Sequence, residues 1–262
     1  MKIFVTSIKE ILKTAVFILL IIISLVSITN IKPSIVTVFI PQKQLPIYYV
    51  GRDDKKMGIT INCAWGDGDI DNILNTLKKH NVKATFFIVG DFAQRYPARV
   101  KQISDAGHDI GSHGYRHIRM GELTKDKIIE DLDKNKKLLD SITGKSVNLY
   151  RPPYGDYNNN VINAANEKGY YAIQWDVDSL DWKPEISMEQ IKARVEKNVK
   201  SGSIVLFHND TKYTASVLDS VLTIVEKKGF IPVKLSELLY TQNYKIESDG
   251  KQVEIKISNT TP

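Results

Sequence analysis

Short apolar runs alternate with longer amphipathic segments along most of the chain. Runs rich in β-branched and aromatic residues are typical of buried strands, and apolar positions at helical spacing are typical of surface helices. Seven strands are expected, over residues 59–64, 84–89, 109–112, 149–151, 172–177, 204–208 and 230–234. Helices are expected around 69–80, 93–106, 124–142, 158–168, 188–200 and 214–228. This alternation predicts an α/β fold with about seven parallel strands, and its regular spacing favours a barrel-like closure.

The first 31 residues have a different pattern. Residues 15–23 are uninterruptedly apolar, and apolar side chains continue to residue 28. This gives about 15–18 residues, the low end of what spans a bilayer. Lysines precede the stretch, so the positive-inside rule places the residues after it outside the cytoplasm. A cleaved signal peptide would have the same charge order, but Val26-Ser27-Ile28 is a poor cleavage site. We therefore expect residues 1–31 to hold a single transmembrane anchor at the cell membrane, with the rest extracytoplasmic.

Three further regions come after the expected anchor. Residues 32–56 contain three prolines and a polar run, which predicts an extended linker. The folded domain is expected over residues 57–240. Beyond it, residues 244–248 and 252–257 alternate apolar and charged side chains around Asp249-Gly250, which is a hairpin signal. We therefore expect a short C-terminal appendage over residues 241–262.

Charge and cysteine content narrow the choice of partners. The formal net charge of +6 suits an acidic surface, such as an anionic cell wall or the face of a membrane. The same charge would suit nucleic acid, but the chain has no basic–aromatic strip or nucleic-acid motif, so nucleic acid is not an expected partner. Cys63 is the only cysteine, so no intrachain disulfide can form and the domain must rely on its hydrophobic core.

Four polar and aromatic clusters lie at or just after the ends of predicted strands. His113 and His117 are four residues apart and can face one point if the backbone turns, as a divalent metal requires. Such a pair alone is more often a surface feature. Three more clusters come after it in order: Arg151-Pro152-Pro153-Tyr154-Gly155, Asp178-Ser179-Leu180-Asp181-Trp182 and Leu206-Phe207-His208. Because active sites of α/β barrels lie at this end of the strands, the clusters together predict a metal-dependent hydrolase with a sugar-sized pocket.

The order of these motifs resembles carbohydrate esterase family 4, the polysaccharide deacetylases that share the NodB-homology domain. The resemblance covers about residues 57–240 and includes the segments 83–90 (Lys-Ala-Thr-Phe-Phe-Ile-Val-Gly) and 107–113 (Gly-His-Asp-Ile-Gly-Ser-His). Leu45-Pro46-Ile47-Tyr48 is similar to a motif of the sporulation-type, membrane-anchored branch. The resemblance implies a distorted (β/α) barrel. It also implies hydrolysis of N-acetyl groups from hexosamine glycans such as peptidoglycan, in cell-wall or spore-cortex metabolism.

The resemblance also implies a ligand set and a catalytic acid. In the family, a divalent cation, often zinc, is held by an aspartate and two histidines, and His113 and His117 match those histidines. Such a metal polarises the acetamide carbonyl and lowers the pKa of bound water. His208 takes the position of the general acid that protonates the leaving amine. Arg151 resembles the arginine that positions the catalytic base.

The remaining matched residues would orient the acid or wall the sugar pocket. Asp178 and Asp181 resemble the carboxylate pair that orients the acid and the arginine. Pro153, Tyr154 and Trp182 occupy positions that would bind the substrate. Each also has a purely structural interpretation: a buried barrel tryptophan or a proline-shaped loop would give the same sequence.

The first motif departs from the family pattern. Its usual form is Thr-Phe-Asp-Asp-Gly, with the first aspartate as base and the second as metal ligand, whereas this chain has Thr60-Ile61-Asn62-Cys63-Ala64. An asparagine amide is not a base, and loss of a general base costs roughly 10²–10⁴ in rate. Cys63 could ligate zinc as a thiolate, although free cysteines are more often buried core residues. Asp67 is a second candidate for the missing base or ligand.

Two functions remain open from the sequence. The first is a membrane-anchored peptidoglycan-type N-deacetylase that is weakened by Asn62. The second is an inactive relative that binds wall glycan or a morphogenesis partner. The substitution at Asn62 favours the second, and the intact later motifs favour the first. We lean towards the hydrolase, because a chain without catalytic constraint would be expected to lose Arg151, Asp181 or His208 as well.

Overall fold

The computed structural model describes residues 7–29 and 43–255, with side chains described for 7–25 and 43–255. The chain divides into two compact units, residues 1–42 and 43–262. In the first unit, helix α1 (Ile8–Thr29) exposes an apolar side chain at every position from 16 to 23. Over the part of the chain with described residues, no helix is both long and apolar enough to cross a membrane. Parts of the expected anchor and linker, residues 1–6 and 30–42, lie outside the described residues.

The second unit is built on a parallel sheet, which confirms the predicted α/β class. Seven strands form a continuous path in the order β6-β5-β4-β3-β2-β8-β7, and β9 pairs with the start of β2. Every described pairing in this sheet is parallel. The strands are β2 (Lys56–Cys63), β3 (Thr85–Ile88), β4 (Asp109–Ser112), β5 (Leu149–Tyr150), β6 (Tyr171–Ala172), β7 (Val177–Asp178), β8 (Ile204–His208) and β9 (Ile231–Val233).

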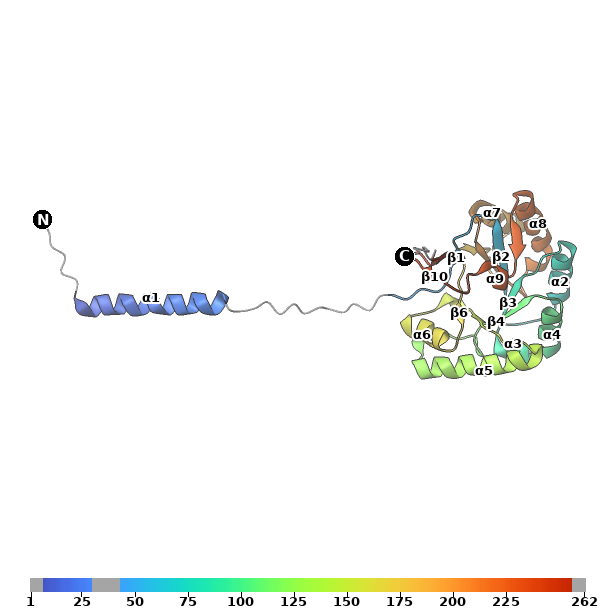
Figure 1. Cartoon of the computed structure of the whole chain (residues 1–262). Coiled ribbons are helices and arrows are strands. Elements are labelled where there is room, and N and C mark those ends of the chain that lie inside the picture. Colours follow the sequence, from blue (N-terminus) through green and yellow to red (C-terminus); the bar gives the residue numbers. More distant parts are fainter. Residues whose placement is uncertain (1–6, 30–42, 256–262) are drawn as a thin grey trace, which may run out of the picture. The chain divides into compact units, whose positions relative to one another are not determined.

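Helices surround the outside of this sheet, while the strands lie inside the ring (Figure 1). Helix α8 packs against both α7 and α2, and α5 packs against both α4 and α6. Local signals set several of their ends: Ser187 and Gln190 form a capping box on α7, and Gly144 ends α5 in a left-handed conformation. The helices are α2 (Ile70–Lys79), α3 (Gly90–Arg95), α4 (Pro97–Asp105), α5 (Lys125–Thr143), α6 (Asn159–Glu167), α7 (Met188–Asn198), α8 (Thr214–Lys227) and α9 (Leu235–Leu238).

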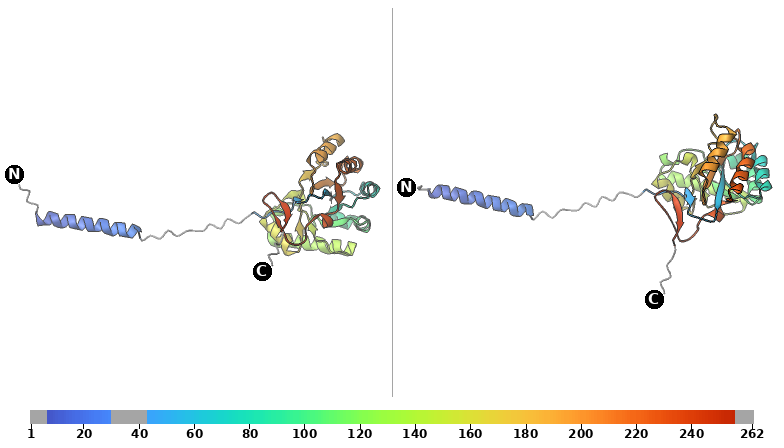
Figure 2. Two further views of the ribbon diagram at one scale, coloured as in Figure 1. Left: turned by 45° about the horizontal axis from the view of Figure 1, so that its top comes forward. Right: turned by 90° about the horizontal axis from the view of Figure 1, so that it is seen from above.

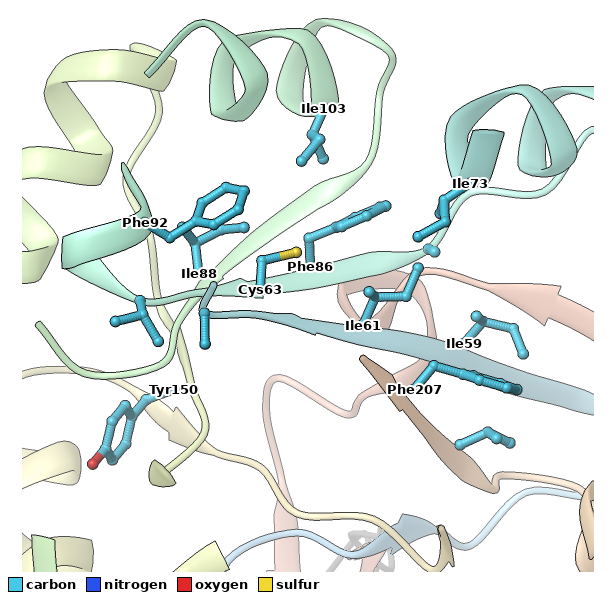
Figure 3. Packing of buried hydrophobic residues seen from close by; sticks show 14 of the residues in the cluster. Ile59, Ile61, Cys63, Ile73, Phe86, Ile88, Phe92, Ile103, Tyr150 and Phe207 are labelled. Carbon is cyan, nitrogen blue, oxygen red and sulfur yellow. The ribbon is translucent and has the colours of Figure 1, made fainter. Parts of the chain in front are cut away.

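The strands separate two apolar clusters. Successive side chains of a strand point to opposite faces, so alternate residues of β2 share an environment. Ile59, Ile61 and Cys63 belong to the larger cluster, between the sheet and the helices, together with Phe86 and Ile88 of β3 (Figure 3). Phe87, the residue between those two, belongs to the smaller cluster inside the barrel. Two-sided burial of this kind explains why the strands are nearly continuous apolar runs in the sequence.

The strand expected over residues 172–177 is wrong in its extent. Its two ends form separate strands, β6 and β7, which lie at opposite ends of the strand order. The residues between them connect the two edges, and β6 and β7 do not pair with each other. The sheet is therefore a barrel that is open between these edges, in keeping with a distorted barrel.

A segment that the sequence assigned to the linker spans this opening. Residues 47–50, here called the closing segment, run from the β6 edge of the sheet to the residues just before β8. On one side, Ile47 accepts from the Gln174 backbone N–H at 2.7 Å and donates to the Ala172 carbonyl at 2.8 Å. On the other, the Val50 N–H donates to the Gly202 carbonyl at 2.9 Å. The folded domain thus includes residues 43–56, and the expected boundary at residue 57 differs from the structure.

The closing segment also pairs with the C-terminal hairpin. Strand β1 (Tyr49–Val50) runs parallel to β11 (Lys251–Glu254), which is antiparallel to β10 (Tyr244–Ile246). In Figure 2 the red hairpin lies beside the blue start of the domain in both views. The hairpin expected around Asp249-Gly250 is therefore present, but it packs into the domain rather than forming a separate appendage. Residues 256–262 lie outside the described residues.

Candidate active site

The C-terminal ends of the strands surround a cavity of about 440 Å³. Seven of the residues selected from the sequence line it: Asn62, His113, His117, Tyr154, Asp178, Trp182 and His208. Sequence reasoning missed three further lining residues, Trp65, Arg119 and Trp175, and named Leu206 only as part of the Leu206-Phe207-His208 cluster. Trp65 comes just after the end of β2, so the rule that found the other clusters could have found it too. A larger groove, of about 770 Å³, lies beside α7 and contains none of these lining residues.

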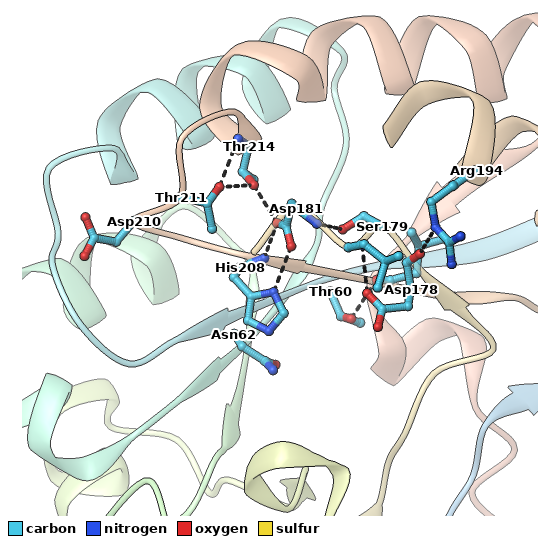
Figure 4. A network of polar contacts seen from close by, with 12 residues as sticks. Thr60, Asn62, Asp178, Ser179, Asp181, Arg194, His208, Asp210, Thr211 and Thr214 are labelled. Carbon is cyan, nitrogen blue, oxygen red and sulfur yellow. Dashed lines mark hydrogen bonds and ion pairs between the residues drawn. The ribbon is translucent and has the colours of Figure 1, made fainter. Parts of the chain in front are cut away.

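His208 is held by a buried carboxylate. Its Nδ1 lies 2.9 Å from Asp181 Oδ1, and its backbone N–H donates to Asp181 Oδ2 at 2.6 Å (Figure 4). Thr214 donates to the same Oδ2 at 2.5 Å. Because a carboxylate accepts hydrogen bonds, Nδ1 carries the proton and Nε2 is the nitrogen that can exchange one. This arrangement would allow His208 to act as a proton donor from a fixed ring orientation.

Arg151 is fully buried beside the cavity without a carboxylate partner among the described residues. One terminal nitrogen, Nη1, donates to Thr60 Oγ1 at 2.9 Å and to Asn62 Oδ1 at 3.0 Å. Nη2 donates to the Gln174 carbonyl at 2.9 Å, and the guanidinium lies over the Phe87 ring at 4.2 Å. Nε is buried without a hydrogen-bond partner. Burial lowers the pKa of Arg151 to about 9, so the group stays charged at neutral pH.

The two histidines of the first cluster lie next to each other. Their ring centroids are 5.2 Å apart. His113 Nδ1 lies 2.7 Å from the Arg151 carbonyl, which can only accept, so the Nε2 lone pair is left available. Burial lowers the pKa of both histidines, and neutral imidazoles are what a metal ion would need. His117 also packs against Tyr154 at 4.4 Å and Trp65 at 5.4 Å, so aromatic rings flank it.

The expected third metal ligand is not in this cavity. Cys63 is buried in the core between the sheet and the helices, on the face opposite Asn62. Asp67 forms an ion pair with Arg99 at 2.8 Å instead of lining the cavity. Among the described residues, no group of three or more histidine, cysteine, aspartate or glutamate side chains could hold a metal ion. The structure therefore brings neither of the possible ligands Cys63 and Asp67 to the two histidines, and Cys63 has the buried core position that was the favoured alternative. The described residues do not fit a three-ligand zinc site.

Exposed aromatic side chains form the walls of the cavity. Trp65, Tyr154 and Trp182 are 51%, 57% and 51% exposed, and all three line it. Pro153 is buried behind Tyr154, within the turn that places Tyr154 in a left-handed conformation with φ of 59°. Large aromatic faces that remain exposed around a polar cavity are typical of a ligand site rather than of a core.

Asp178 contributes a carboxylate to the cavity wall. Its Oδ1 accepts from the Leu180 backbone N–H at 2.8 Å, and burial raises its pKa. The Asp178 carbonyl accepts from Arg194 Nε at 3.1 Å, which ties this loop to α7. Asp178 and Asp181 therefore lie in different environments: Asp178 lines the cavity, while Asp181 is enclosed behind His208.

Comparison with known proteins points to one family. The family described as polysaccharide deacetylase matches residues 50–173. The uncharacterized protein YlxY of Bacillus subtilis is 35% identical over 80% of this chain and 65% of its own length. The peptidoglycan-N-acetylmuramic acid deacetylase PdaA of B. subtilis is 31% identical over 77% of this chain and 78% of its own length.

A solved structure that is similar to this chain belongs to a pseudoenzyme rather than to an active deacetylase. It is a mutant of BA3943 from Bacillus anthracis, described as a CE4 family pseudoenzyme with restored enzymatic activity. It is 35% identical to this chain, covers 74% of it and 71% of its own chain, and superimposes with a TM-score of 0.72. Both active deacetylases and a pseudoenzyme are thus similar to this chain.

Proposed function

Because the chain belongs to the polysaccharide deacetylase family, we propose that it binds the N-acetylated glycan of the cell wall without the hydrolytic rate of an active member. The single observation that carries this proposal is Asn62, which occupies the base position in an otherwise assembled site. An amide cannot accept the proton of an attacking water at any relevant pH. Removal of a positioned base costs roughly 10²–10⁴ in rate.

The metal-ligand position gives independent support. With Cys63 in the apolar core, the described residues place no third metal-ligating side chain beside His113 and His117. In the family the metal supplies Lewis-acid stabilisation of the oxyanion, and that contribution would be lost or weakened here. Two parts of the reaction are therefore affected by two consecutive substitutions, at Asn62 and Cys63.

Glycan binding is supported by what the site retains. The cavity has the size of a small-molecule site and carries three exposed aromatic walls, Trp65, Tyr154 and Trp182. Several relatives are described as peptidoglycan deacetylases, acting on N-acetylmuramic acid or N-acetylglucosamine. We propose that the ligand of this chain comes from the same class, in cell-wall or spore-cortex metabolism.

A slow deacetylase is the second candidate function. It is favoured by the preserved arrangement of His208, Asp181 and Thr214, which would still orient a general acid. A protein that only binds glycan does not need that buried hydrogen-bond network. Residual acetate release that depends on His208 would support this second candidate.

We also propose that the protein is held at the cell membrane through its N-terminal segment, with the second unit outside the cytoplasm. Two features of the sequence support this: the apolar stretch of residues 15–28 and the lysines that precede it. The structure describes side chains only as far as residue 25 of this stretch. Fractionation of cells that produce the full chain tests this location.

Acetate release and glycan binding, measured on the same preparations, test the proposed function. The full chain is incubated with N-acetylglucosamine oligomers and with peptidoglycan, with and without added zinc, beside an Asn62→Asp variant. We expect the wild type to bind without measurable release, and Asn62→Asp to release acetate. The matched control is His208→Ala, which should keep binding. Rapid release by the wild type, or no glycan binding, would refute the proposal.

A further inference from the structure

The orientation of the Asn62 amide is set by its partner. The guanidinium of Arg151 has only hydrogen-bond donors, so the atom of Asn62 that faces it must be the oxygen. The 3.0 Å contact between Arg151 Nη1 and Asn62 Oδ1 has this orientation. Thr60 Oγ1 donates in turn to the Val205 carbonyl at 2.7 Å, so its lone pairs face the same guanidinium. Arg151 therefore fixes the amide with its NH₂ group on the side away from the guanidinium.

The NH₂ group of Asn62 is left for a ligand. Asn62 lines the cavity, and no described residue accepts a hydrogen bond from its Nδ2. Its strand neighbour is His208, with which it is in register, and Figure 4 shows the two side chains close together below Asp181. The floor of the cavity thus offers an N–H donor at a position where an aspartate would offer only acceptors.

The substitution also changes the charge around the cavity. Arg151 is a buried cation beside the floor, and Arg119 is a cation of the lining, whereas Asp178 is the only carboxylate among the lining residues. An aspartate at position 62 would give Arg151 an anionic partner. With the neutral Asn62, the hydrogen-bond partners of the Arg151 guanidinium are all uncharged, which disfavours a cationic ligand at the Asn62 amide.

An acetamido group and a free amine differ in just these properties. The acetamido group is neutral and has a carbonyl acceptor, an N–H donor and a methyl group. The free amine of a deacetylated sugar lacks the carbonyl acceptor, and in its protonated ammonium form it has donors only. The donor on Asn62 matches the carbonyl, and Leu206 in the cavity lining can contact the methyl group.

We propose that Asn62 is a specificity residue: its NH₂ group donates to the carbonyl oxygen of an intact acetamido group, so the cavity retains N-acetylated sugars and rejects deacetylated ones. This inference rests on the proposed function, since it assumes that the cavity binds cell-wall glycan. The protein would thus recognise whether a sugar is acetylated. An aspartate at position 62 would act as the base that helps remove the acetyl group, whereas Asn62 instead offers a hydrogen-bond donor to that group.

The test compares two oligomers that differ only in acetylation. Binding of an N-acetylglucosamine tetramer and of a glucosamine tetramer to the full chain is measured by calorimetry at neutral pH. The wild type should bind the acetylated tetramer at least about tenfold more tightly, the scale of one hydrogen bond to a buried group. In Asn62→Asp, measured with a chelator present so that the acetylated tetramer is not hydrolysed, Arg151 keeps a partner and the preference should be lost or reversed, because a carboxylate attracts the ammonium groups.

Two further variants separate specificity from general damage. Asn62→Ala should lose the preference without gaining affinity for the amine, and its melting temperature checks that the fold survives. Trp182→Ala should weaken both tetramers by a similar factor, because an aromatic wall does not distinguish them. If the wild type binds both tetramers equally, the inference about Asn62 is wrong while the proposed function stands. If it binds neither, the proposed function itself fails.

Discussion

Asn62 and Cys63 are consecutive residues at the end of β2, yet their side chains lie on opposite faces of the sheet. Asn62 points into the barrel like Thr60, and Cys63 points into the layer under the helices like Ile61. The alternation of a strand is the reason: neighbouring side chains face opposite sides unless the strand has ended. Strand β2 continues through Cys63, so the thiol cannot turn towards the two histidines.

The position of Cys63 predicts a thiol that does not react in the native protein. The side chain is fully buried, and burial raises its pKa, so both access and the thiolate fraction are low. We expect labelling by an aromatic disulfide reagent to be slow in buffer and complete in denaturant, with no effect of zinc. Fast native labelling that zinc suppresses would instead identify Cys63 as a ligand.

His108 predicts an acid-dependent loss of stability. Its Nδ1 accepts from the Ala84 N–H at 3.0 Å, which requires the unprotonated ring. Burial, together with the charges of Lys83 and Lys234, lowers its pKa to about 4. Because the folded-state pKa is depressed, the unfolded chain binds more protons below its ordinary value of about 6.5. Stability is therefore retained above that pH and falls between about 6.5 and 4.

The expected loss over that interval is about 3 kcal/mol, from about 1.36 kcal/mol for each pH unit. Urea denaturation across this pH range measures it. His108→Asn removes the titrating ring and keeps an acceptor for Ala84, so its stability should vary less with pH. An ordinary titration of His108 near 6.5 by NMR would contradict the prediction.

The convergence of residues that come just after strand ends was predictable, because parallel strands bring their C-terminal ends to one edge of the sheet. That rule selected His113, Tyr154, Trp182 and His208, which the structure does bring to one cavity. It could not show that Cys63 faces away, because a one-residue difference in where a strand ends reverses the side chain. The enclosed position of Asp181 depends on contacts with His208 and Thr214, which only the folded chain defines.

At the scale of elements, the short strands are where sequence reasoning failed. The closing segment includes a two-residue strand, too short for a period of two to be recognised. The contact between the closing segment and Gly202 requires a glycine. Gly202 has a φ of 79° and approaches the Val50 carbonyl so closely that a Cβ would collide with that group. Long helices such as α5 and α8 were predictable, since they show an apolar face over several turns.

Replacement of Ile47 should therefore destabilise the whole domain. The side chain is fully buried in the apolar cluster inside the barrel, and its backbone hydrogen bonds to Ala172 and Gln174 hold the closing segment against the β6 edge. We expect Ile47→Ala to lower the free energy of unfolding by about 3 kcal/mol, as for other buried isoleucines. Ile231→Ala is the matched control, because Ile231 is half exposed. Equal losses in urea denaturation would show that the closing segment does not stabilise the fold.

At the scale of the whole molecule, the proposed membrane attachment predicts how the full chain fractionates. Helix α1 exposes apolar side chains, including Leu19 and Ile22. We expect the full chain to remain with membranes after alkaline carbonate extraction. Leu19→Lys/Ile22→Lys should release it, because charges within an apolar stretch oppose burial in lipid. The control, Ile231→Lys in the second unit, should stay bound, and release of the unmodified chain would exclude the proposed attachment.

The whole architecture was predictable only in outline. The alternation of strands and helices indicated the α/β class and a parallel sheet, because that pattern repeats over most of the chain. The boundary of the domain was not predictable, since the residues that extend it begin at Lys43 and owe their order to distant partners. Pairing between Ile47 and Ile173, or between Tyr49 and Lys251, leaves no local signal in the sequence.

The closing segment has a consequence for how the chain folds as it is synthesised. The closing segment leaves the ribosome before any of its partners. The Tyr49 hydroxyl, for example, can donate its hydrogen bond to Asp249 only after 200 further residues have been synthesised. Contacts of such large sequence separation form late and slow the overall rate. A chain that stops short of the hairpin therefore lacks β11, the strand partner of β1, and leaves that edge of the closing segment exposed, so this pairing between the two ends of the domain distinguishes finished from unfinished protein.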